Sequence, residues 1–238
     1  MNPFVQLVKD LSGRIGSGFS SINQNDPSKV AYVRNLEREM KSQNALDVPF
    51  DELNVVVFDL ETTGFFPYKG DQILSFGAVK VEGTEILREK TFYSLVSSEA
   101  EPSEEIEQLT GITKEMIMNA DPLRDVLKRF YDFIKHDVLV AHHASHEKQF
   151  MDHATWLGLK KKFQHRIVDT SFLTKIAHQE LVSLDECCEH YCIVNEQRHH
   201  ALYDALATAE LWVKCIHEVK ELGFTNLQDV YTHLATQK

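Results

Sequence analysis

The sequence predicts an α/β fold in which helices cover a mixed β-sheet. An apolar run at residues 55–58 is typical of a strand buried on both faces. Residues 72–81 and 85–96 are predicted to form two further strands, joined at Glu82-Gly83 as an antiparallel pair. Farther along the chain, short apolar strands alternate with helical patterns. A meander followed by such alternation describes a mixed sheet with helical layers.

Residues 1–50 are predicted to be a helical N-terminal extension. Apolar residues recur at helical spacing over residues 4–11, and Asp26-Pro27 offers a cap and a first-turn proline for a second helix. The Gly-, Ser- and Asn-rich segment between these helices indicates a linker. The first helix could lie on a membrane or a partner, but it has no basic face, so packing on the body of the protein is the preferred interpretation.

The remaining elements follow the chain from residue 104 onward. Two short strands are expected at residues 137–141 and 165–169. Helices are expected over residues 104–109, 122–135, 145–157, 171–178, 183–191 and 201–222. The predicted organisation is therefore the extension (1–50), one main domain (51–222) and a C-terminal helical tail (223–238).

Length and composition restrict the class of protein. A chain of 238 residues accommodates one domain of about 180 residues plus extra segments. The formal net charge of −11 excludes a generally basic nucleic-acid-binding surface, so phosphate must be bound locally or through metal ions. The sequence contains no secretory signal, no disulfide framework and no apolar run near the length of a membrane span, which favours a cytoplasmic protein without a membrane partner.

Two carboxylates stand at the end of the first predicted strand. Asp59 and Glu61 are two residues apart and should share one face of the strand. Adjacent carboxylates repel, and a divalent cation between them relieves that repulsion. The alternative is a strand that simply ends in an acidic turn. The Thr62-Thr63-Gly64 segment that follows supplies two hydroxyls and allows close approach by a ligand, which favours the metal site.

Two later segments add candidate residues. Glu147 falls in the first turn of a predicted helix, where the helix dipole alone would also favour an acid. His199 and Asp204 lie at the start of the last long helix. Because five helical residues turn through about 140° beyond a full turn, these two converge on one site only if His199 precedes the helix.

Three sequence segments together resemble the motifs of a known family. They are FDLETTG at 58–64, VAHHASHEKQF at 140–150 and HHALYDALATAEL at 199–211, and they are similar in kind and order to the motifs of the DEDDh 3′ to 5′ exonucleases. That family includes the proofreading epsilon subunit of bacterial DNA polymerase III. The segments GDQILSFGAVKV, LTGIT and VDTSFL also follow the family pattern in order. The resemblance implies a ribonuclease H-like fold.

The resemblance implies a metal-dependent exonuclease that releases nucleoside 5′-monophosphates from the 3′ end of single-stranded nucleic acid, with DNA preferred. His199 matches the general base. Two divalent ions, Mg²⁺ or Mn²⁺, are implied, with carboxylate ligands Asp59, Glu61, Glu147 and Asp204. Contacts to the terminal nucleotide are expected from Thr62, Thr63, Gly64, Phe65 and His142.

The second motif departs from the family pattern. Glu147 stands where the family has Asp, and His143 stands where Asn is usual. The longer side chain, by roughly 1.5 Å, predicts an active enzyme that is slower or prefers Mn²⁺. Asp152 is a poor substitute because five helical positions separate it from Glu147.

Two alternatives remain at the level of sequence. One is a 3′ to 5′ exoribonuclease or oligoribonuclease-like enzyme, since nothing in the sequence reads the 2′-hydroxyl. The other is a catalytically impaired nucleic-acid-binding module in which Glu147 has spoiled the metal site. A DNA polymerase or another replication or repair protein is a candidate partner, through residues 1–50 or otherwise.

Three further features admit two interpretations each. Phe65 and Phe66 could stack on bases or pack in the core. The basic run at residues 160–166 could guide a nucleic-acid backbone or be a solvated loop. A zinc site could be suggested by Cys187, Cys188, His190 and Cys192, but they lie on or next to one predicted helix, so buried apolar cysteines are preferred.

Overall fold

The computed structural model describes residues 45–177 and 181–236. Both helices predicted before residue 41 lie outside this range. Within the described ranges, no helix combines the length and apolar character needed to cross a bilayer.

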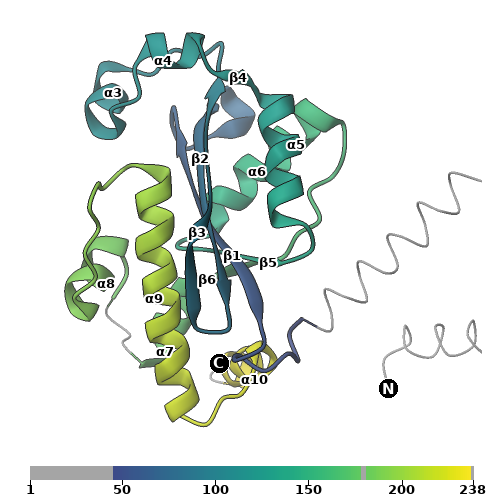
Figure 1. The fold of residues 1–238 in the computed structure, drawn as a ribbon, viewed down its shortest axis with the longest axis vertical. Helices are drawn as coiled ribbons and strands as arrows, with labels where there is room; N and C mark the ends of the chain where they lie inside the picture. Colours follow the sequence, from purple (N-terminus) through teal and green to yellow (C-terminus); the bar gives the residue numbers. More distant parts are fainter. Residues whose placement is uncertain (1–44, 178–180, 237–238) are drawn as a thin grey trace, which may run out of the picture. The chain divides into compact units, whose positions relative to one another are not determined.

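A six-stranded mixed sheet forms the centre of the fold, as predicted. Its strand order is β4-β3-β2-β1-β5-β6 (Figure 1). Pairing is antiparallel between β1 and β2 and between β2 and β3, and parallel for the other neighbours. The strands are β1 (Asn54–Thr62), β2 (Ile73–Glu82), β3 (Glu85–Ser97), β4 (Asp121–Pro122), β5 (Val138–Ala141) and β6 (Ile167–Asp169).

Helices cover both faces of this sheet. In Figure 1, α5 and α6 lie on one side, and α7, α8 and α9 lie on the other. The described helices are η2 (Pro67–Lys69), α3 (Glu104–Thr110), α4 (Lys114–Met118), α5 (Leu123–Ile134), α6 (Ser145–Leu159), α7 (Thr170–Ala177), α8 (Leu184–Tyr191), α9 (Ala201–Glu221) and α10 (Leu227–Thr236). The predicted mixed α/β architecture is therefore confirmed.

Strand β1 divides two hydrophobic cores. Val55 and Val57 point into the core beneath α9, whereas Phe58 and Leu60 point into the core beneath α5 and α6. This alternation buries the strand on both faces, as its apolar run predicted. Asp59 continues the α9-facing series, so the fold directs the acidic end of β1 toward α9.

Local signals explain where several helices begin. The Ser103 and Thr113 side chains accept hydrogen bonds from the first turns of α3 and α4. Ser183 and Glu186 form a capping box at the start of α8. Helix α4 and the two-residue strand β4 were not predicted, because segments this short give little periodic signal.

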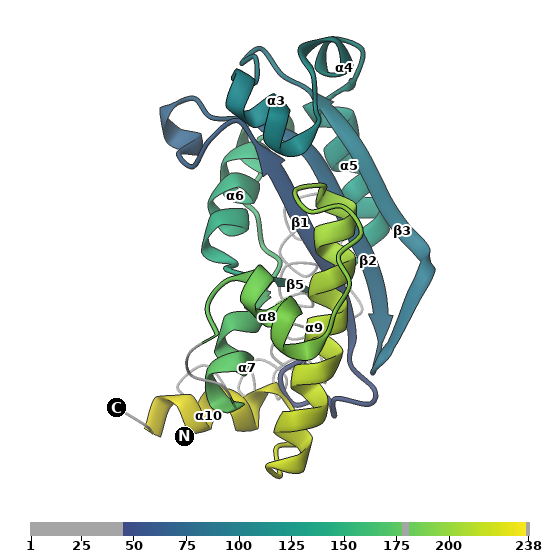
Figure 2. The ribbon, with the colours of Figure 1, turned by 90° about the vertical axis from the view of Figure 1, so that its left-hand side faces the viewer.

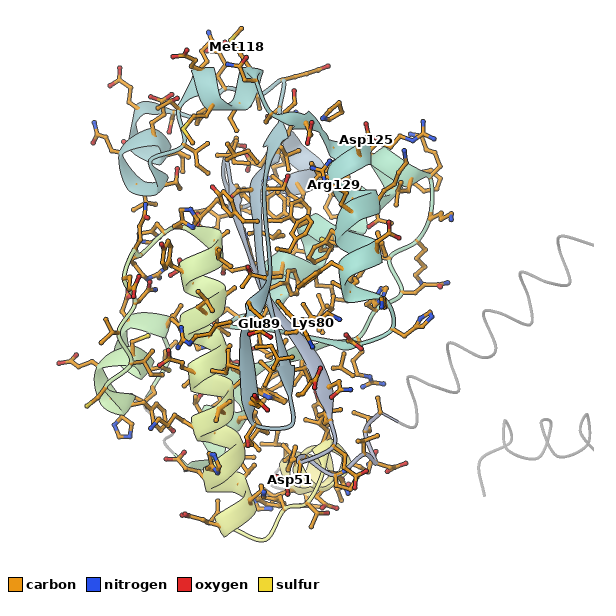
Figure 3. The ribbon with its side chains drawn as sticks, viewed as in Figure 1. Asp51, Lys80, Glu89, Met118, Asp125 and Arg129 are labelled. Atoms are coloured by element: carbon orange, nitrogen blue, oxygen red, sulfur yellow. The ribbon has the colours of Figure 1, made fainter. Side chains whose placement is uncertain are left out.

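Residues at the two ends of the described domain pack together. Phe50 is buried in the α9-side core, and its backbone N–H donates to Thr225. Leu46 accepts a backbone hydrogen bond from Gln228 in α10. Ion pairs at the surface join other elements: Lys220 contacts Asp51, and Arg129 contacts Asp121. Figure 3 labels Asp51 near the lower end of the view and Arg129 on α5.

Candidate active site

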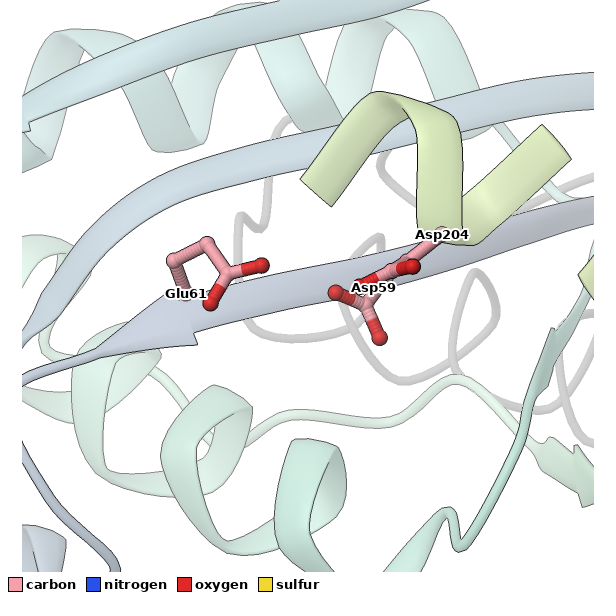
Figure 4. Close-up of side chains that lie close together, drawn as sticks. All are labelled: Asp59, Glu61 and Asp204. Atoms are coloured by element: carbon pink, nitrogen blue, oxygen red, sulfur yellow. The ribbon is translucent and has the colours of Figure 1, made fainter. Parts of the chain in front are cut away.

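Three carboxylates meet where β1 ends against α9. Asp59 and Glu61 extend from β1, and Asp204 extends from the first turn of α9 (Figure 4). One oxygen from each lies within 4.8 Å of the others. A divalent cation with oxygen ligands suits such a group. The fold thus joins the predicted acidic pair to an acid far away in the sequence.

A glycine on the neighbouring strand makes this meeting possible. Gly77 in β2 is the cross-strand partner of Asp59. A Cβ added at Gly77 would lie 2.1 Å from the backbone carbonyl carbon of Ala201, the first residue of α9. Only glycine therefore lets the start of α9 rest on β2 and bring Asp204 to β1. The register of β1 with β2 also shifts between Glu61 and Thr62, and such an irregularity can re-aim a side chain.

Glu147 approaches the same group from α6. It lies in the first helical turn, its residue surface is 5% exposed, and it interacts electrostatically with Asp59 and Glu61. It is not one of the three residues whose oxygens lie within 4.8 Å. Its Oε2 atom is buried and has no hydrogen-bond partner among the described residues. An orphaned carboxylate oxygen beside other acids has the chemistry of a cation ligand.

Burial and mutual repulsion favour the protonated forms of these acids. Burial, followed by the charge of Asp204, raises the pKa of Glu61 to about 8. Burial raises the pKa of Glu147 to about 8. The pKa of Asp59 is raised well above its ordinary value by burial, then by Glu61, Glu147 and Asp204. A divalent cation would reverse this preference, so the residues fit the metal that the sequence implied.

A single loop holds Asp204 in place. The Asn195 side chain donates to Oδ1 at 2.5 Å, and the Arg198 guanidinium donates to Oδ2 at 2.5 Å. The backbone N–H of His199 donates to Oδ2 at 3.0 Å. Arg198 also pairs with Asp185 at 2.6 Å, which anchors the loop to α8. Sequence reasoning singled out neither Asn195 nor Arg198.

His199 lies before α9, as its convergence with Asp204 required. The helix begins at Ala201, and His199 has a left-handed backbone with φ of 62°. Burial lowers the pKa of the His199 imidazole, and the charge of Arg198 lowers it further. The neutral ring is therefore the dominant form near pH 7. The next residue, His200, stacks on Tyr93 with ring centroids 4.5 Å apart.

The loop after β1 has a tighter internal structure than the sequence suggested. The Thr62 hydroxyl donates to the Gly64 carbonyl at 2.7 Å, and the Thr63 hydroxyl accepts from the Gln72 N–H at 3.0 Å. A Cβ at Gly64 would lie 2.4 Å from a carboxylate oxygen of Asp71. The space that this glycine leaves is therefore filled by Asp71.

Phe65 and Phe66 lie on the surface, with 74% and 56% of their areas exposed. The interpretation that they pack in the core is wrong. A surface position four residues after Glu61 leaves the Phe65 ring available to a ligand, and its centroid lies 5.8 Å from that of His146.

His142 is buried away from solvent. Its Nδ1 lies 2.7 Å from the Thr170 hydroxyl, and its Nε2 lies 2.9 Å from the Val182 carbonyl. A carbonyl can only accept, so Nε2 carries the proton and Nδ1 accepts from Thr170. The structure does not place His142 in the carboxylate group.

Asp169 is a positioning residue that sequence reasoning left without a role. Its carboxylate accepts hydrogen bonds from the N–H groups of His143, Ala144 and Ser171 at 2.9 to 3.1 Å. His143 has a positive φ of 57°. Asp169 thereby fixes the turn that leads into α6 and Glu147. The VDTSFL segment at the end of β6 was the available signal.

Asp152 and the clustered cysteines take ordinary structural positions. Asp152 pairs with Lys148 at 2.9 Å on the surface of α6, so it does not take the place of Glu147. Cys187 and Cys188 are buried, as expected, but Cys192 is exposed, so the prediction of a buried cysteine is wrong there. Cys192 ends α8 in a left-handed conformation, which turns it out of the helix.

Comparison with known proteins identifies the family. A family profile described as Exonuclease matches residues 56–212. The chain belongs to this exonuclease family. The exonuclease family that the three motifs predicted is confirmed by this match. Its family and its fold are therefore those of exonucleases.

Two relatives illustrate the sequence similarity. The DNA polymerase III PolC-type protein of Thermotoga maritima is 32% identical over 189 residues, covering 77% of this chain and 13% of that protein. The DNA polymerase III subunit epsilon-like protein of Rhodobacter capsulatus is 31% identical over 225 residues, covering 93% of this chain and 32% of that protein. The chain therefore spans only a minor part of these relatives.

Solved structures share the fold. Exonuclease X in complex with 5′ overhanging duplex DNA has a TM-score of 0.59 and 20% identity, covering 75% of this chain and 98% of that one. The nuclease domain of 3′hExo, a DEDDh family member bound to rAMP, has a TM-score of 0.61 and 21% identity, covering 69% and 92%. The predicted ribonuclease H-like fold is confirmed by these neighbours.

Proposed function

We propose that this exonuclease removes nucleoside 5′-monophosphates from the 3′ end of single-stranded nucleic acid, with DNA as the main substrate. The observation that carries the proposal is the acidic group of Asp59, Glu61 and Asp204, beside the orphaned oxygen of Glu147. Such a group needs cations to be ionised, and phosphate needs cations to approach an acidic protein.

Asp59, Glu61, Glu147 and Asp204 would hold the divalent ions, Mg²⁺ or Mn²⁺. When bound, such ions supply activation of a water molecule and neutralisation of charge on the phosphodiester. The chain's own residues do the rest. Asn195 and Arg198 hold the Asp204 carboxylate, and Asp169 holds the turn before Glu147.

His199 is the proposed general base. Its lowered pKa keeps the imidazole neutral near pH 7, so the ring can accept the proton of the attacking water. Its backbone N–H donates to the Asp204 carboxylate, which holds the backbone of His199 at the acidic group. A general base that is already positioned before substrate binds lowers the barrier more than one that the substrate itself must position.

The loop after β1 is the proposed contact for the terminal nucleotide. Phe65 offers an exposed ring to any base, which suits digestion without sequence preference. The internal bonds of Thr62 and Thr63 stiffen the backbone that carries Phe65. His142, with both ring nitrogens engaged, would act through the neighbouring loop instead of touching the substrate.

The names of relatives support DNA over RNA. The PolC-type and epsilon-like proteins are DNA polymerase III proteins, and from them we infer a cytoplasmic role beside a DNA polymerase. RNA remains the second candidate because one structural neighbour is bound to rAMP.

The test uses single-stranded DNA and RNA of one sequence, each labelled at either end and incubated with Mg²⁺ or Mn²⁺. We expect a 5′-labelled DNA ladder that shortens one nucleotide at a time, and nucleoside monophosphate from the 3′ label. Asp59→Asn and His199→Ala should each lower the rate by at least about 100-fold. The proposal would be rejected, in favour of a binding module, if both variants digested DNA as fast as the parent protein or if the parent digested neither nucleic acid.

A further inference from the structure

A stripe of aromatic and polar side chains follows one face of α6. Its members recur at three- and four-residue spacing: His146, Gln149, His153, Trp156 and, just after the helix, Lys160. All are at least partly exposed. Trp156 is 58% exposed, although tryptophan is usually well buried.

The loop after β1 provides a second set of rings facing this stripe. Phe65 lies edge-on to His146 with centroids 5.8 Å apart, and Tyr68 lies against His153 at 5.1 Å. Both Phe65 and Tyr68 are largely exposed. Figure 2 shows the short loop after β1 beside the labelled helix α6, and contacts between η2 and α6 agree with that view.

The stripe begins at the candidate active site. His146 is adjacent in sequence to Glu147, and its Nε2 lies 3.5 Å from the hydroxyl of Thr62. Thr62 directly follows Glu61. From His146 to Trp156 the helix rises about 15 Å, which corresponds to about four stacked bases at ~3.4 Å each.

Positive charge accompanies the rings. The Lys69 amine lies 4.5 Å from the Phe66 ring centroid, and the Lys160 amine lies 5.8 Å from that of Trp156. Lys161 and Lys162 are exposed, and neither they nor Lys160 forms an ion pair with any described residue. These charges stand out in a chain with a net charge of −11.

The neighbouring acids are already engaged. Lys148 pairs with Asp152, and the Asp71 carboxylate accepts from the Phe66 N–H. The lysines at the far end of α6 are therefore left to attract an anion. Exposed rings with cations beside them match a single-stranded nucleic acid, whose bases stack while its phosphates meet the charges. A protein partner would have to leave those lysines unpaired or supply acids for them.

We propose that Tyr68, His153, Trp156 and Lys160 form a track that binds the single strand upstream of its terminal nucleotide. This inference rests on the proposed function, because it takes the strand's end to lie at the carboxylates. The track deepens that function by predicting tighter binding of substrates that are long enough to reach Trp156. Binding along it is independent of sequence because every base has a ring face to stack.

The test separates strand length from chemistry. KM and kcat are measured for the full chain on oligothymidylates of three and twelve nucleotides. Tyr68→Ala and Trp156→Ala should each raise KM for the longer strand about tenfold, as expected for loss of one stacked base. For Trp156→Ala, kcat and the KM for the trinucleotide should stay unchanged. Lys160→Gln should flatten the salt dependence of KM for the longer strand.

Phe172→Ala is the matched control, because Phe172 is a half-exposed aromatic on α7. If Tyr68→Ala and Trp156→Ala behave like Phe172→Ala, or raise KM equally for both lengths, the track is wrong while the exonuclease assignment stands. If the parent digests nothing, fluorescence anisotropy with a labelled twelve-nucleotide strand replaces KM. Loss of affinity in Trp156→Ala would then support the track without the hydrolysis, and unchanged affinity would overturn it.

Discussion

At the scale of single residues, Asp204 shows how the loop before α9 organises the site. Its carboxylate accepts from Asn195 on one oxygen and from Arg198 and His199 on the other. A guanidinium in this position supplies positive charge to an acid whose side chain is 3% exposed. Arg198 is therefore a positioning residue for the Asp204 carboxylate, which would otherwise be repelled by Asp59 and Glu61.

Removing this partner should destabilise the metal-free protein. Arg198→Ala leaves the buried Asp204 without its cation, and we expect the free energy of unfolding to fall by about 2 kcal/mol. For a domain of this size that lowers Tm by roughly 4–8 °C. The measurement is thermal unfolding in chelator, repeated with Mg²⁺, where a bound divalent ion should restore most of the loss.

Arg88→Ala is the matched control for Arg198→Ala. Arg88 pairs with Glu210 at the surface with 60% of its side chain exposed, so its loss should change Tm by less than about 2 °C. A Tm of Arg198→Ala that equals the parent's in chelator would show that Asp204 does not need the guanidinium.

Glu147 is the second residue whose identity makes a prediction. Its side chain is one methylene longer than the Asp expected from the family resemblance. Glu147→Asp should raise activity with Mg²⁺ about three- to tenfold relative to activity with Mn²⁺, because Mg²⁺ demands stricter ligand geometry. Rates in each metal across a concentration series measure this. Asp152→Asn, on the surface of the same helix, should leave the ratio unchanged; an unchanged ratio in Glu147→Asp would refute the idea.

At the scale of elements, the contact between β2 and α9 controls whether the acids meet. Gly77→Ala would place a Cβ 2.1 Å from the Ala201 carbonyl carbon. We expect α9 to shift and Asp204 to move away from β1, with a loss of at least about 3 kcal/mol of stability and most of the activity. Denaturant unfolding and the exonuclease assay measure both.

Gly111→Ala is the control that separates the clash with α9 from the backbone strain of replacing a glycine. Gly111 has a positive φ of 71° but open space around an added Cβ. Its replacement should cost only about 1–2 kcal/mol, from backbone strain. If Gly77→Ala is no worse than Gly111→Ala and keeps full activity, the close approach of α9 is not essential.

The same elements show what sequence could predict. The strands β1, β2 and β3 and most helices lie within a few residues of their predicted positions, because each has a strong apolar period. The short helix α4 was missed for lack of such a period. The meeting of Asp59 with Asp204 was reached through ordered motifs, since no local pattern encodes a contact across that separation.

Several contacts of the site could not be predicted from the sequence, for a physical reason. The bonds of Asn195 and Arg198 to Asp204, and of Asp169 to the turn before α6, depend on how loops pack in space. Gly77 was a missed signal of a different kind: a glycine inside an apolar strand often marks close approach by another backbone.

At the scale of the whole molecule, the acidic group lies at the end of the strand that separates the two cores. Its charge therefore bears on the stability of the entire domain. In the folded protein the pKa of Glu61 and that of Glu147 are raised to about 8, from an ordinary value of 4.5. Between those values the folded state binds more protons than the unfolded state, so the free energy of unfolding must fall as pH rises.

We expect the metal-free protein to lose thermal stability between pH 5 and about 8, and to change little from this cause above that range. A decrease of several degrees in Tm is expected, since about 1 kcal/mol corresponds to ~2–4 °C at this size. Mg²⁺ or Mn²⁺ should stabilise the protein more at pH 8 than at pH 5, because the ionised carboxylates bind the cation. Scanning calorimetry with and without chelator measures both trends.

The double variant Glu61→Gln/Glu147→Gln is the control, and its Tm should vary much less with pH. If the Tm of the parent rises from pH 5 to 8 in chelator, the fold does not hold these carboxylates protonated.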